Sequence, residues 1–385
     1  MNIKWGYNTI NGDYVCAKTQ IELEKYKKNN PNRSIVDLGV GDVKFSPPKE
    51  VCKALVDWSK KMANLKTFLG YGDEQGDDEL RRLIAVDYNN RGINVEKSEI
   101  FITNGAKNGL SELMQIATFK QALIFNPTYP LYAELCSLYG IKTKIVDENC
   151  NLNKKLSGLV GKNACDIVFL CSPNNPTGKV FSLKKLRQLI NYVNLVKGVL
   201  IIDCAYAAYC KYFLSALKIE NSERVIEVHS FSKSISYTGI RCGYTIIKKK
   251  NPFYEPYKKY LSLHTNGVNI IAQKGAIAFF DKKCKSKVQK RIDYYRTNAK
   301  ILKEPFVNAG IKVLGGVNAP YLFCNVKNKN FAGALLSECG VVVTNGGGFG
   351  KNGWIRISCL GKKENAIEGA KRIEVFLKTK GIIFL

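Results

Sequence analysis

The chain has 385 residues, of which 45% are hydrophobic and 24% are charged, and this ordinary composition excludes a disordered, collagen-like or coiled-coil protein. Its formal net charge is +27, but the cationic residues are spread along the chain, so we interpret the charge as a solvated basic surface. The sequence contains neither a run of 18 apolar residues nor a signal-like start. We therefore expect a cytoplasmic protein with no membrane partner.

The spacing of cysteine and histidine indicates no metal site. The 13 cysteines never come closer than six positions, and the two histidines, His229 and His264, lie far apart in the sequence. Zinc and dithiol chemistry both need closer pairs than these. We expect reduced thiols that mostly fill apolar sites, no metal, and a catalytic proton carrier other than histidine.

From about residue 100, short apolar runs alternate with longer amphipathic stretches. Strands are expected at residues 100–103, 122–125, 167–171, 199–203, 225–229 and 243–247. Helices are expected between them, for example at residues 107–117 and 183–196. This alternation predicts an α/β fold with a mostly parallel sheet, in which ligands bind at the carboxyl ends of the strands.

The pattern changes after about residue 282. A long polar helix at residues 285–303 is followed by a strand, a helix, a second strand and a closing helix, near residues 321–326, 332–338, 354–358 and the chain end. This order predicts a smaller α+β domain. We expect a large domain at residues 43–284, and a small domain built from residues 1–42 and 285–385.

The segment with the clearest chemical signal is Ser230-Phe231-Ser232-Lys233, which directly follows an expected strand, with Arg241 eight residues later. A lysine amine can bond to an aldehyde, while hydroxyls and a guanidinium can hold a phosphate. An isolated lysine of this kind would more often lie on the surface. Together, these residues indicate a phosphorylated aldehyde cofactor.

Two other strand ends carry residues that suit the ring of such a cofactor. Asn175 follows one strand within Asn-Asn-Pro-Thr-Gly, and Asp203 ends the next, three residues before Tyr206. Asp203 could simply cap the strand end, or its carboxylate could keep a pyridine nitrogen protonated. In the second case, Asn175 and Tyr206 would donate hydrogen bonds to the phenolic oxygen of the ring.

In this order and spacing, the motifs resemble those of the class I/II pyridoxal-phosphate aminotransferases of fold type I. The resemblance implies a large domain with a mostly parallel seven-stranded sheet, a smaller α+β domain, pyridoxal 5′-phosphate as cofactor and a homodimer with shared active sites. It also implies that Ala106 and Lys107 open a helix at the phosphate and that Tyr129 stacks on the cofactor ring.

The substrates implied by this resemblance are small amino acids and 2-oxo acids. A permanently charged guanidinium can hold an α-carboxylate with two parallel hydrogen bonds, and Arg356 occupies the position of the carboxylate-binding arginine of the family. Gly41 matches the glycine whose backbone lies against that carboxylate. By the same resemblance, Lys107, Tyr129 and Asn175 also contact the substrate.

The segment Gly70-Tyr71-Gly72-Asp73-Glu74-Gln75-Gly76 is similar to that of the LL-diaminopimelate aminotransferases. In that family the tyrosine reaches the phosphate held by the neighbouring subunit, and the glutamate faces the far end of the substrate. A carboxylate there would pair with a second ammonium group. The resemblance also assigns cofactor and substrate contacts to Asn266, which would cross the dimer interface, and a substrate contact to Tyr14.

The resemblance implies amino transfer between LL-2,6-diaminopimelate or tetrahydrodipicolinate and glutamate or 2-oxoglutarate, as in lysine biosynthesis. Lys233, Asp203 and Tyr129 are then the catalytic residues. Two alternatives remain at this point. One is a related aminotransferase acting on lysine, aspartate or aromatic amino acids, and the other is an inactive scaffold that binds nucleic acid through its charge; on the main reading we expect no specific nucleic-acid partner.

Overall fold

The computed structural model describes residues 15–381. Its largest sheet comprises β2 (Ile100–Thr103), β3 (Gln121–Asn126), β4 (Lys142–Asp147), β5 (Ile167–Cys171), β6 (Val199–Asp203), β7 (Val225–Ser230) and β8 (Gly243–Ile247). Within these residues the spatial order is β2-β8-β7-β6-β5-β3-β4, and β8 alone runs antiparallel to its neighbours. The α/β fold with a mostly parallel seven-stranded sheet is therefore confirmed.

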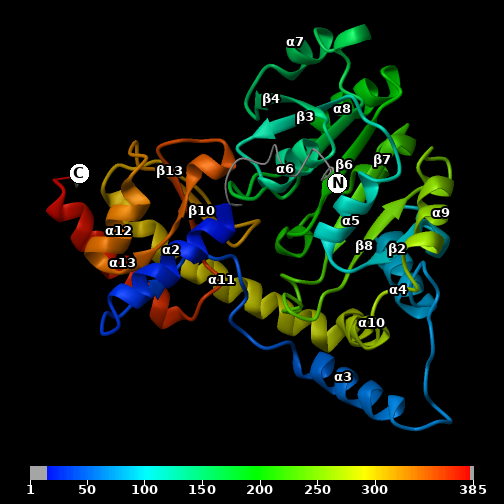
Figure 1. Ribbon diagram of the computed structural model, residues 1–385, viewed down its shortest axis with the longest axis horizontal. Helices are drawn as coiled ribbons and strands as arrows, with labels where there is room; N and C mark the ends of the chain where they lie inside the picture. The colour runs from blue at the N-terminus through cyan, green and yellow to red at the C-terminus, as the bar shows by residue number, and fades with distance from the viewer. Residues whose placement is uncertain (1–14, 382–385) are drawn as a thin grey trace, which may run out of the picture.

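Helices cover both faces of this sheet (Figure 1). One face packs against α4 (Asp78–Asn89), α8 (Leu183–Leu195) and α10 (Ile270–Ile277), and the other packs against α5 (Ala106–Leu113), α6 (Leu131–Leu138) and α9 (Tyr254–His264). Side chains alternate between the two cores, as period-two strands require. In β5, Val168 belongs to the first core and Phe169 to the second. Burial on both faces explains why these strands are almost continuously apolar.

A second sheet lies beside the first in Figure 1 and carries the C-terminal part of the chain. It comprises β9 (Val313–Gly315), β10 (Tyr321–Asn325), β12 (Thr344–Asn345) and β13 (Trp354–Ser358). Among the described residues its order is β12-β13-β10-β9, with every pair antiparallel. Its helices are α2 (Val15–Asn29), α12 (Phe331–Cys339) and α13 (Lys363–Thr379).

The N-terminal segment joins this second part of the molecule. The short strand β1 (Val36–Asp37) pairs in parallel with β11 (Val341–Val342), so residues about 300 positions apart lie side by side. Val36 and Leu38 belong to the same apolar core as β10 and β13. This pairing brings Gly41 close to the end of the large sheet.

Helix α11 (Lys282–Asn308) connects the two parts (Figure 1). Val288 and Ile292, in its first half, pack in the core of the large sheet, whereas Leu302 and Phe306 pack in the core of the second sheet. The helix starts three residues earlier than expected, because the Asp281 side chain accepts hydrogen bonds from two free backbone N–H groups of the first turn. The domain boundary at residues 284 and 285 stays a prediction, and it falls inside this helix.

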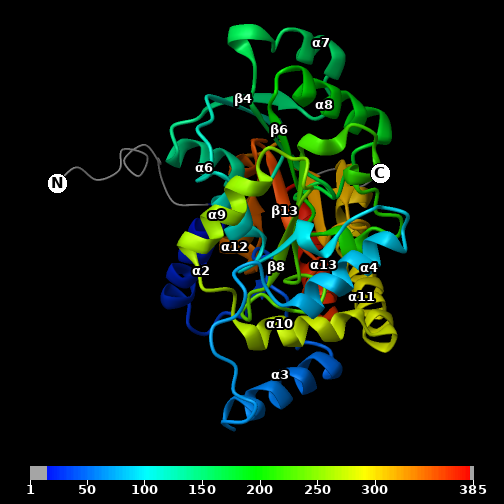
Figure 2. The same cartoon turned by 90° about the vertical axis from the view of Figure 1, so that its right-hand side faces the viewer.

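The remaining helices lie at the periphery. Helix α3 (Lys49–Met62) packs against α10 at one edge of the molecule in both views (Figures 1 and 2), and α7 (Leu152–Ser157) packs against α8. Short 3-10 turns complete the fold at Lys97–Glu99, Gly161–Asn163, Ala207–Tyr209, Ala216–Lys218, Ser222–Arg224, Ala278–Phe280 and Gly346–Phe349. No helix within residues 15–381 is long and apolar enough to cross a membrane.

Candidate active site

A cavity of about 310 Å³ lies at the carboxyl ends of β5, β6 and β7, where the two parts of the chain meet. Its position is the one expected for a ligand site in a sheet of this kind. Most of the predicted site residues line it: Gly41, Ala106, Lys107, Tyr129, Asn175, Asp203, Tyr206, Ser230, Ser232, Lys233, Arg241 and Arg356. The fold therefore brings together residues that are more than 300 positions apart in the sequence.

One end of the cavity is suited to a phosphate. The Arg241 guanidinium donates to the Ser232 hydroxyl over 3.1 Å and to the backbone carbonyl of Asn104 over 3.4 Å. Helix α5 begins at this point with Gly105 as its N-cap, so its first backbone N–H groups have no partner within the helix. A Cβ on Gly105 would lie 2.3 Å from the Arg241 guanidinium, and the φ of +91° at this position favours glycine.

Asp203 lies at the floor of the cavity and is 4% exposed. Its carboxylate accepts hydrogen bonds from the Tyr132 hydroxyl over 2.9 Å and from the Ala205 backbone N–H over 3.0 Å. Burial raises the pKa of Asp203 above its usual value, although these hydrogen bonds partly oppose the shift. A cationic group placed against Asp203 would restore the preference for the charged carboxylate.

Lys233 follows β7 by three residues, and its ammonium group contacts the backbone carbonyl of Gly41. Tyr129 follows β3 by three residues, and its ring meets that of Tyr132 edge to face, with 5.8 Å between centroids. Both side chains are half-buried and line the cavity. The lysine amine and an aromatic ring therefore face the same space.

Arg356, in the middle of β13, is 2% exposed and faces the cavity. Its guanidinium donates to the Asn175 side-chain carbonyl over 3.2 Å and to the Gly39 backbone carbonyl over 3.0 Å. The same guanidinium lies over the rings of Tyr321 and Phe349, with its central carbon 4.5 and 4.8 Å from the centroids. These contacts fix a planar cation at the side of the cavity where an anionic substrate group can reach it.

Three predicted residues do not line the cavity. Tyr71, Glu74 and Asn266 are all exposed, and Tyr71 is 89% accessible to solvent. The segment of Tyr71 and Glu74 lies next to the segment of Asn266. A Cβ added to Gly267 would be only 2.9 Å from the Asp73 carbonyl oxygen. Tyr14 lies outside the described residues.

The cavity also contains residues that the sequence analysis did not assign. Tyr321 and Thr238 line it, and Tyr132 contacts Asp203 from behind. Tyr321 and Tyr132 are buried aromatic residues, which in a sequence look the same as ordinary core residues. The only available signal was the position of Tyr132, three residues after Tyr129 on the first turn of a helix.

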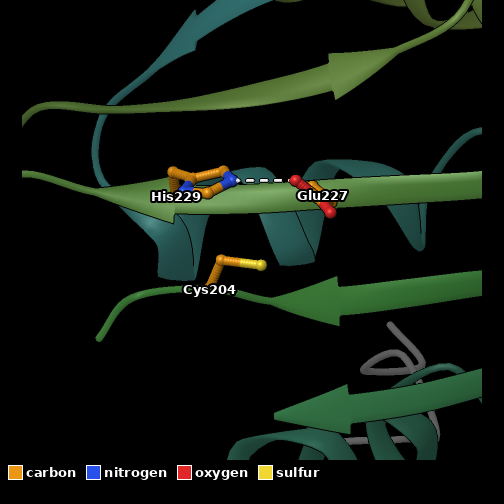
Figure 3. A group of neighbouring side chains, drawn as sticks. All are labelled: Cys204, Glu227 and His229. Carbon is orange, nitrogen blue, oxygen red and sulfur yellow. Dashed lines mark hydrogen bonds and ion pairs between the residues drawn. The ribbon is translucent and has the colours of Figure 1, made fainter. Parts of the chain in front are cut away.

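A separate buried group lies behind the cavity floor, formed by Cys204, Glu227 and His229 (Figure 3). Glu227 and His229 share one face of β7, and pairing of β6 with β7 brings Cys204 next to them, which the linear spacing could not indicate. Glu227 accepts hydrogen bonds from Tyr88, Ser215, a backbone N–H and His229 over 2.8 to 3.3 Å. Because these partners already satisfy the carboxylate, we do not assign a metal to this group.

A family model supports the class that this fold and site define. The model of aminotransferase class I and II matches residues 33–373. The chain therefore belongs to the class I/II aminotransferases, a pyridoxal-phosphate-dependent family.

Individual relatives agree over nearly the full chain. It is 32% identical to an LL-diaminopimelate aminotransferase from Bacteroides fragilis, over 94% of this chain and 96% of the relative. Among solved structures, it superposes on the L,L-diaminopimelate aminotransferase from Chlamydomonas reinhardtii with a TM-score of 0.89, 26% identity and 98% coverage of both chains. It also superposes on an aspartate aminotransferase from Thermotoga maritima with a TM-score of 0.86 and 25% identity, over 98% of this chain and 100% of the other.

The residues present fit pyridoxal 5′-phosphate. The Gly105 backbone leaves room for the Arg241 guanidinium at the helix N-terminus, which suits a phosphate dianion. Asp203 is a buried carboxylate that forms no salt bridge among the described residues, which suits a protonated pyridine nitrogen. When bound, this cofactor supplies an electron sink that stabilises negative charge at a substrate α-carbon.

Proposed function

We propose that the protein transfers an amino group between LL-2,6-diaminopimelate or tetrahydrodipicolinate and glutamate or 2-oxoglutarate. The observation that carries the proposal is the convergence of Lys233, Asp203, Arg241 and Arg356 on one cavity. The relatives named above support diaminopimelate as the substrate, since two of the three carry that activity in their names. Within that similarity, the motif around Glu74 supports a carboxylate at the distal end of the substrate.

Each residue then has a chemical task. Lys233 would hold the cofactor through its amine, and as a free amine its Nζ would accept the proton that leaves the substrate α-carbon. Asp203 would keep a pyridine nitrogen protonated, and Asn175 and Tyr206 would donate hydrogen bonds to the ring oxygen. Arg356 holds the α-carboxylate with two parallel hydrogen bonds and so orients the α-carbon toward Lys233.

The same proposal includes a homodimer with shared sites. The segments that contain Tyr71 and Asn266 are exposed, and they carry apolar side chains in contact with solvent, notably Leu65 at 97% and Leu263 at 81% accessibility. A second copy of the chain would bury these side chains. It would also bring Glu74 of one subunit to the distal ammonium of a substrate held by Arg356 of the other. We further propose a cytoplasmic location.

The amino donor decides between this proposal and the related aminotransferases. Purified protein loaded with pyridoxal phosphate is given LL-diaminopimelate, lysine, aspartate or tyrosine with 2-oxoglutarate, and glutamate formation is followed. We expect LL-diaminopimelate to give a kcat/KM at least about tenfold above the other donors, because only it offers a distal ammonium and carboxylate to the pocket. The aspartate aminotransferase among the structural relatives makes aspartate the alternative donor to watch.

A matched pair of variants connects the preference to the distal carboxylate. Glu74→Gln should lower kcat/KM for LL-diaminopimelate but leave that for aspartate within about twofold. Glu79→Gln, an exposed acid on nearby α4 that pairs with Arg82, serves as the control and should change neither. Turnover of another donor with none of LL-diaminopimelate would overturn the substrate assignment.

A further inference from the structure

Tyr321 occupies a junction between the two sheets. It begins β10, is 1% exposed, and stands opposite Ser358 of β13, two residues beyond Arg356. Residues two apart on a strand share a face, and the Tyr321 and Arg356 side chains meet diagonally across the antiparallel pair. The central carbon of the guanidinium lies 4.5 Å from the centroid of the Tyr321 ring.

The hydroxyl of Tyr321 reaches the other sheet. It lies 3.0 Å from the hydroxyl of Tyr206 in a buried hydrogen bond, and the two rings meet edge to face at 5.5 Å. Tyr206 belongs to the loop that follows β6, three residues after Asp203. This hydrogen bond therefore links the second sheet directly to the cofactor side of the cavity.

Gly41 completes the junction. A Cβ at this position would lie 2.3 Å from the Tyr321 hydroxyl oxygen, so the tyrosine approaches the backbone as closely as glycine permits. The carbonyl of Gly41 accepts a hydrogen bond from the Lys233 ammonium. Tyr321 thus contacts Tyr206 and Arg356, and it also touches the residue that holds Lys233.

We propose that Tyr321 is a positioning residue. It aligns Tyr206, which would contact the ring oxygen of the cofactor, with Arg356, which would contact the substrate carboxylate. Its hydroxyl donates to the Tyr206 oxygen, which directs the Tyr206 proton toward the cofactor, and its ring face holds the Arg356 guanidinium. The inference rests on the proposed roles of Tyr206 and Arg356. It is independent of which amino acid is the donor.

The environment of Tyr206 favours this arrangement. Burial raises the pKa of Tyr206 well above its usual value, so the hydroxyl keeps its proton and remains a donor. A hydrogen bond accepted by the same oxygen polarises that hydroxyl and strengthens its donation. Tyr321 would in this way stabilise the deprotonated form of the cofactor ring oxygen.

Two substitutions separate the two contacts of Tyr321. Tyr321→Phe removes the hydroxyl and keeps the ring beneath Arg356, whereas Tyr321→Leu removes both. Tyr295→Phe is the matched control, because Tyr295 is also 1% exposed, lies outside the cavity, and has a hydroxyl without a hydrogen-bond partner among the described residues. All variants are loaded with pyridoxal phosphate and checked for folding by circular dichroism.

The first measurement follows the visible absorption of the protein loaded with pyridoxal phosphate as the pH is varied. Its readout is the pH at which the absorption change is half complete. Tyr321→Phe and Tyr321→Leu should both raise this midpoint by about 0.5 pH unit or more, since the ring oxygen loses support for its deprotonated form. Tyr295→Phe should leave it unchanged. This readout does not depend on turnover or on the identity of the donor.

The second measurement determines kcat and KM of each variant separately, with the amino donor that gives the highest turnover. Tyr321→Phe should lower kcat about fivefold with KM within about twofold, whereas Tyr321→Leu should also raise KM about tenfold as Arg356 loses its support. A Tyr321→Phe variant that matches Tyr295→Phe in both midpoint and kcat would overturn the inference. If wild-type protein shows no visible absorption band with the cofactor, the proposed function fails instead.

Discussion

At the residue scale, the site depends on a few charged side chains around one cavity. Arg356 is 2% exposed, and carbonyl groups and aromatic rings hold its guanidinium, so it is oriented before any substrate arrives. Asp203 is equally buried, but its partners are neutral hydroxyl and amide groups. The carboxylate of Asp203 is therefore destabilised until a cation binds against it.

Asp203→Asn tests this account of the carboxylate. Because burial raises the pKa of Asp203, the stability associated with its protonated form is lost as the pH rises through that pKa. At neutral pH the buried charge opposes folding of the cofactor-free protein, so Asp203→Asn should not lower its melting temperature. The dissociation constant for pyridoxal phosphate should instead rise about 30-fold, measured by fluorescence titration.

A graded variant accompanies this experiment. Tyr132→Phe removes one hydrogen bond to Asp203 and keeps the charge, so cofactor binding should weaken only about threefold. If Asp203→Asn bound the cofactor as tightly as wild type, the carboxylate would not face the pyridine nitrogen.

At the element scale, the sequence predicted the strands and helices whose burial produces a regular apolar pattern. All six expected strands of the large sheet form, because each buries both faces and is therefore mostly apolar. The edge strand β4 was not located in advance, because most of its side chains are exposed and Lys142 and Lys144 interrupt any apolar pattern. An edge strand is defined by its hydrogen bonds to β3, which leave little trace in the sequence.

The residues of the candidate site likewise divide into those that the sequence could indicate and those that it could not. Lys233, Asp203 and Arg241 could be found because short motifs at strand ends carry their chemistry. Tyr321 and the contacts of Tyr88 with Glu227 and His229 could not, because they form only when elements far apart in the sequence meet. Contact across elements is a property of the fold and not of local spacing.

The buried group behind the cavity gives a prediction for the β6–β7 pair. Burial alone would raise the pKa of Glu227, but its hydrogen bonds and its proximity to His229 outweigh burial and lower that pKa. A lowered pKa stabilises the fold above the ordinary glutamate value of about 4.3, and this contribution is lost as the pH falls. Glu227→Gln should lower the unfolding free energy at pH 7 by about 3 kcal/mol and flatten the loss of stability between about pH 5 and pH 3.

Chemical denaturation across pH measures this effect. Tyr88→Phe keeps the charge and should cost about 1 kcal/mol with the acid dependence intact. Glu96→Gln, at an exposed pair with Lys249, should leave the acid dependence of stability unchanged. An unchanged acid dependence in Glu227→Gln would show that the carboxylate does not carry this contribution.

At the scale of the whole molecule, one chain supplies most of an active site but leaves part of its sequence motif on the surface. The residues proposed to bind the cofactor and the substrate carboxylate line the cavity. Glu74 and Asn266 instead lie on exposed segments next to apolar side chains. The net charge of +27 is distributed over the chain and suits attraction of acidic cofactors and oxo acids, while our proposal assigns specific binding to Arg241 and Arg356. The proposed function therefore requires two copies of the chain.

Subunit mixing tests this central claim most directly. Lys233→Ala and Glu74→Gln proteins are each assayed with LL-diaminopimelate and 2-oxoglutarate, then unfolded together in equal amounts, refolded and assayed again. Each variant alone should be nearly inactive. In a mixed dimer, one site combines Lys233 of one subunit with Glu74 of the other, so random pairing should restore about a quarter of wild-type activity. Activity no higher than the average of the two separate variants, in a mixture that has refolded as dimers, would contradict the shared site.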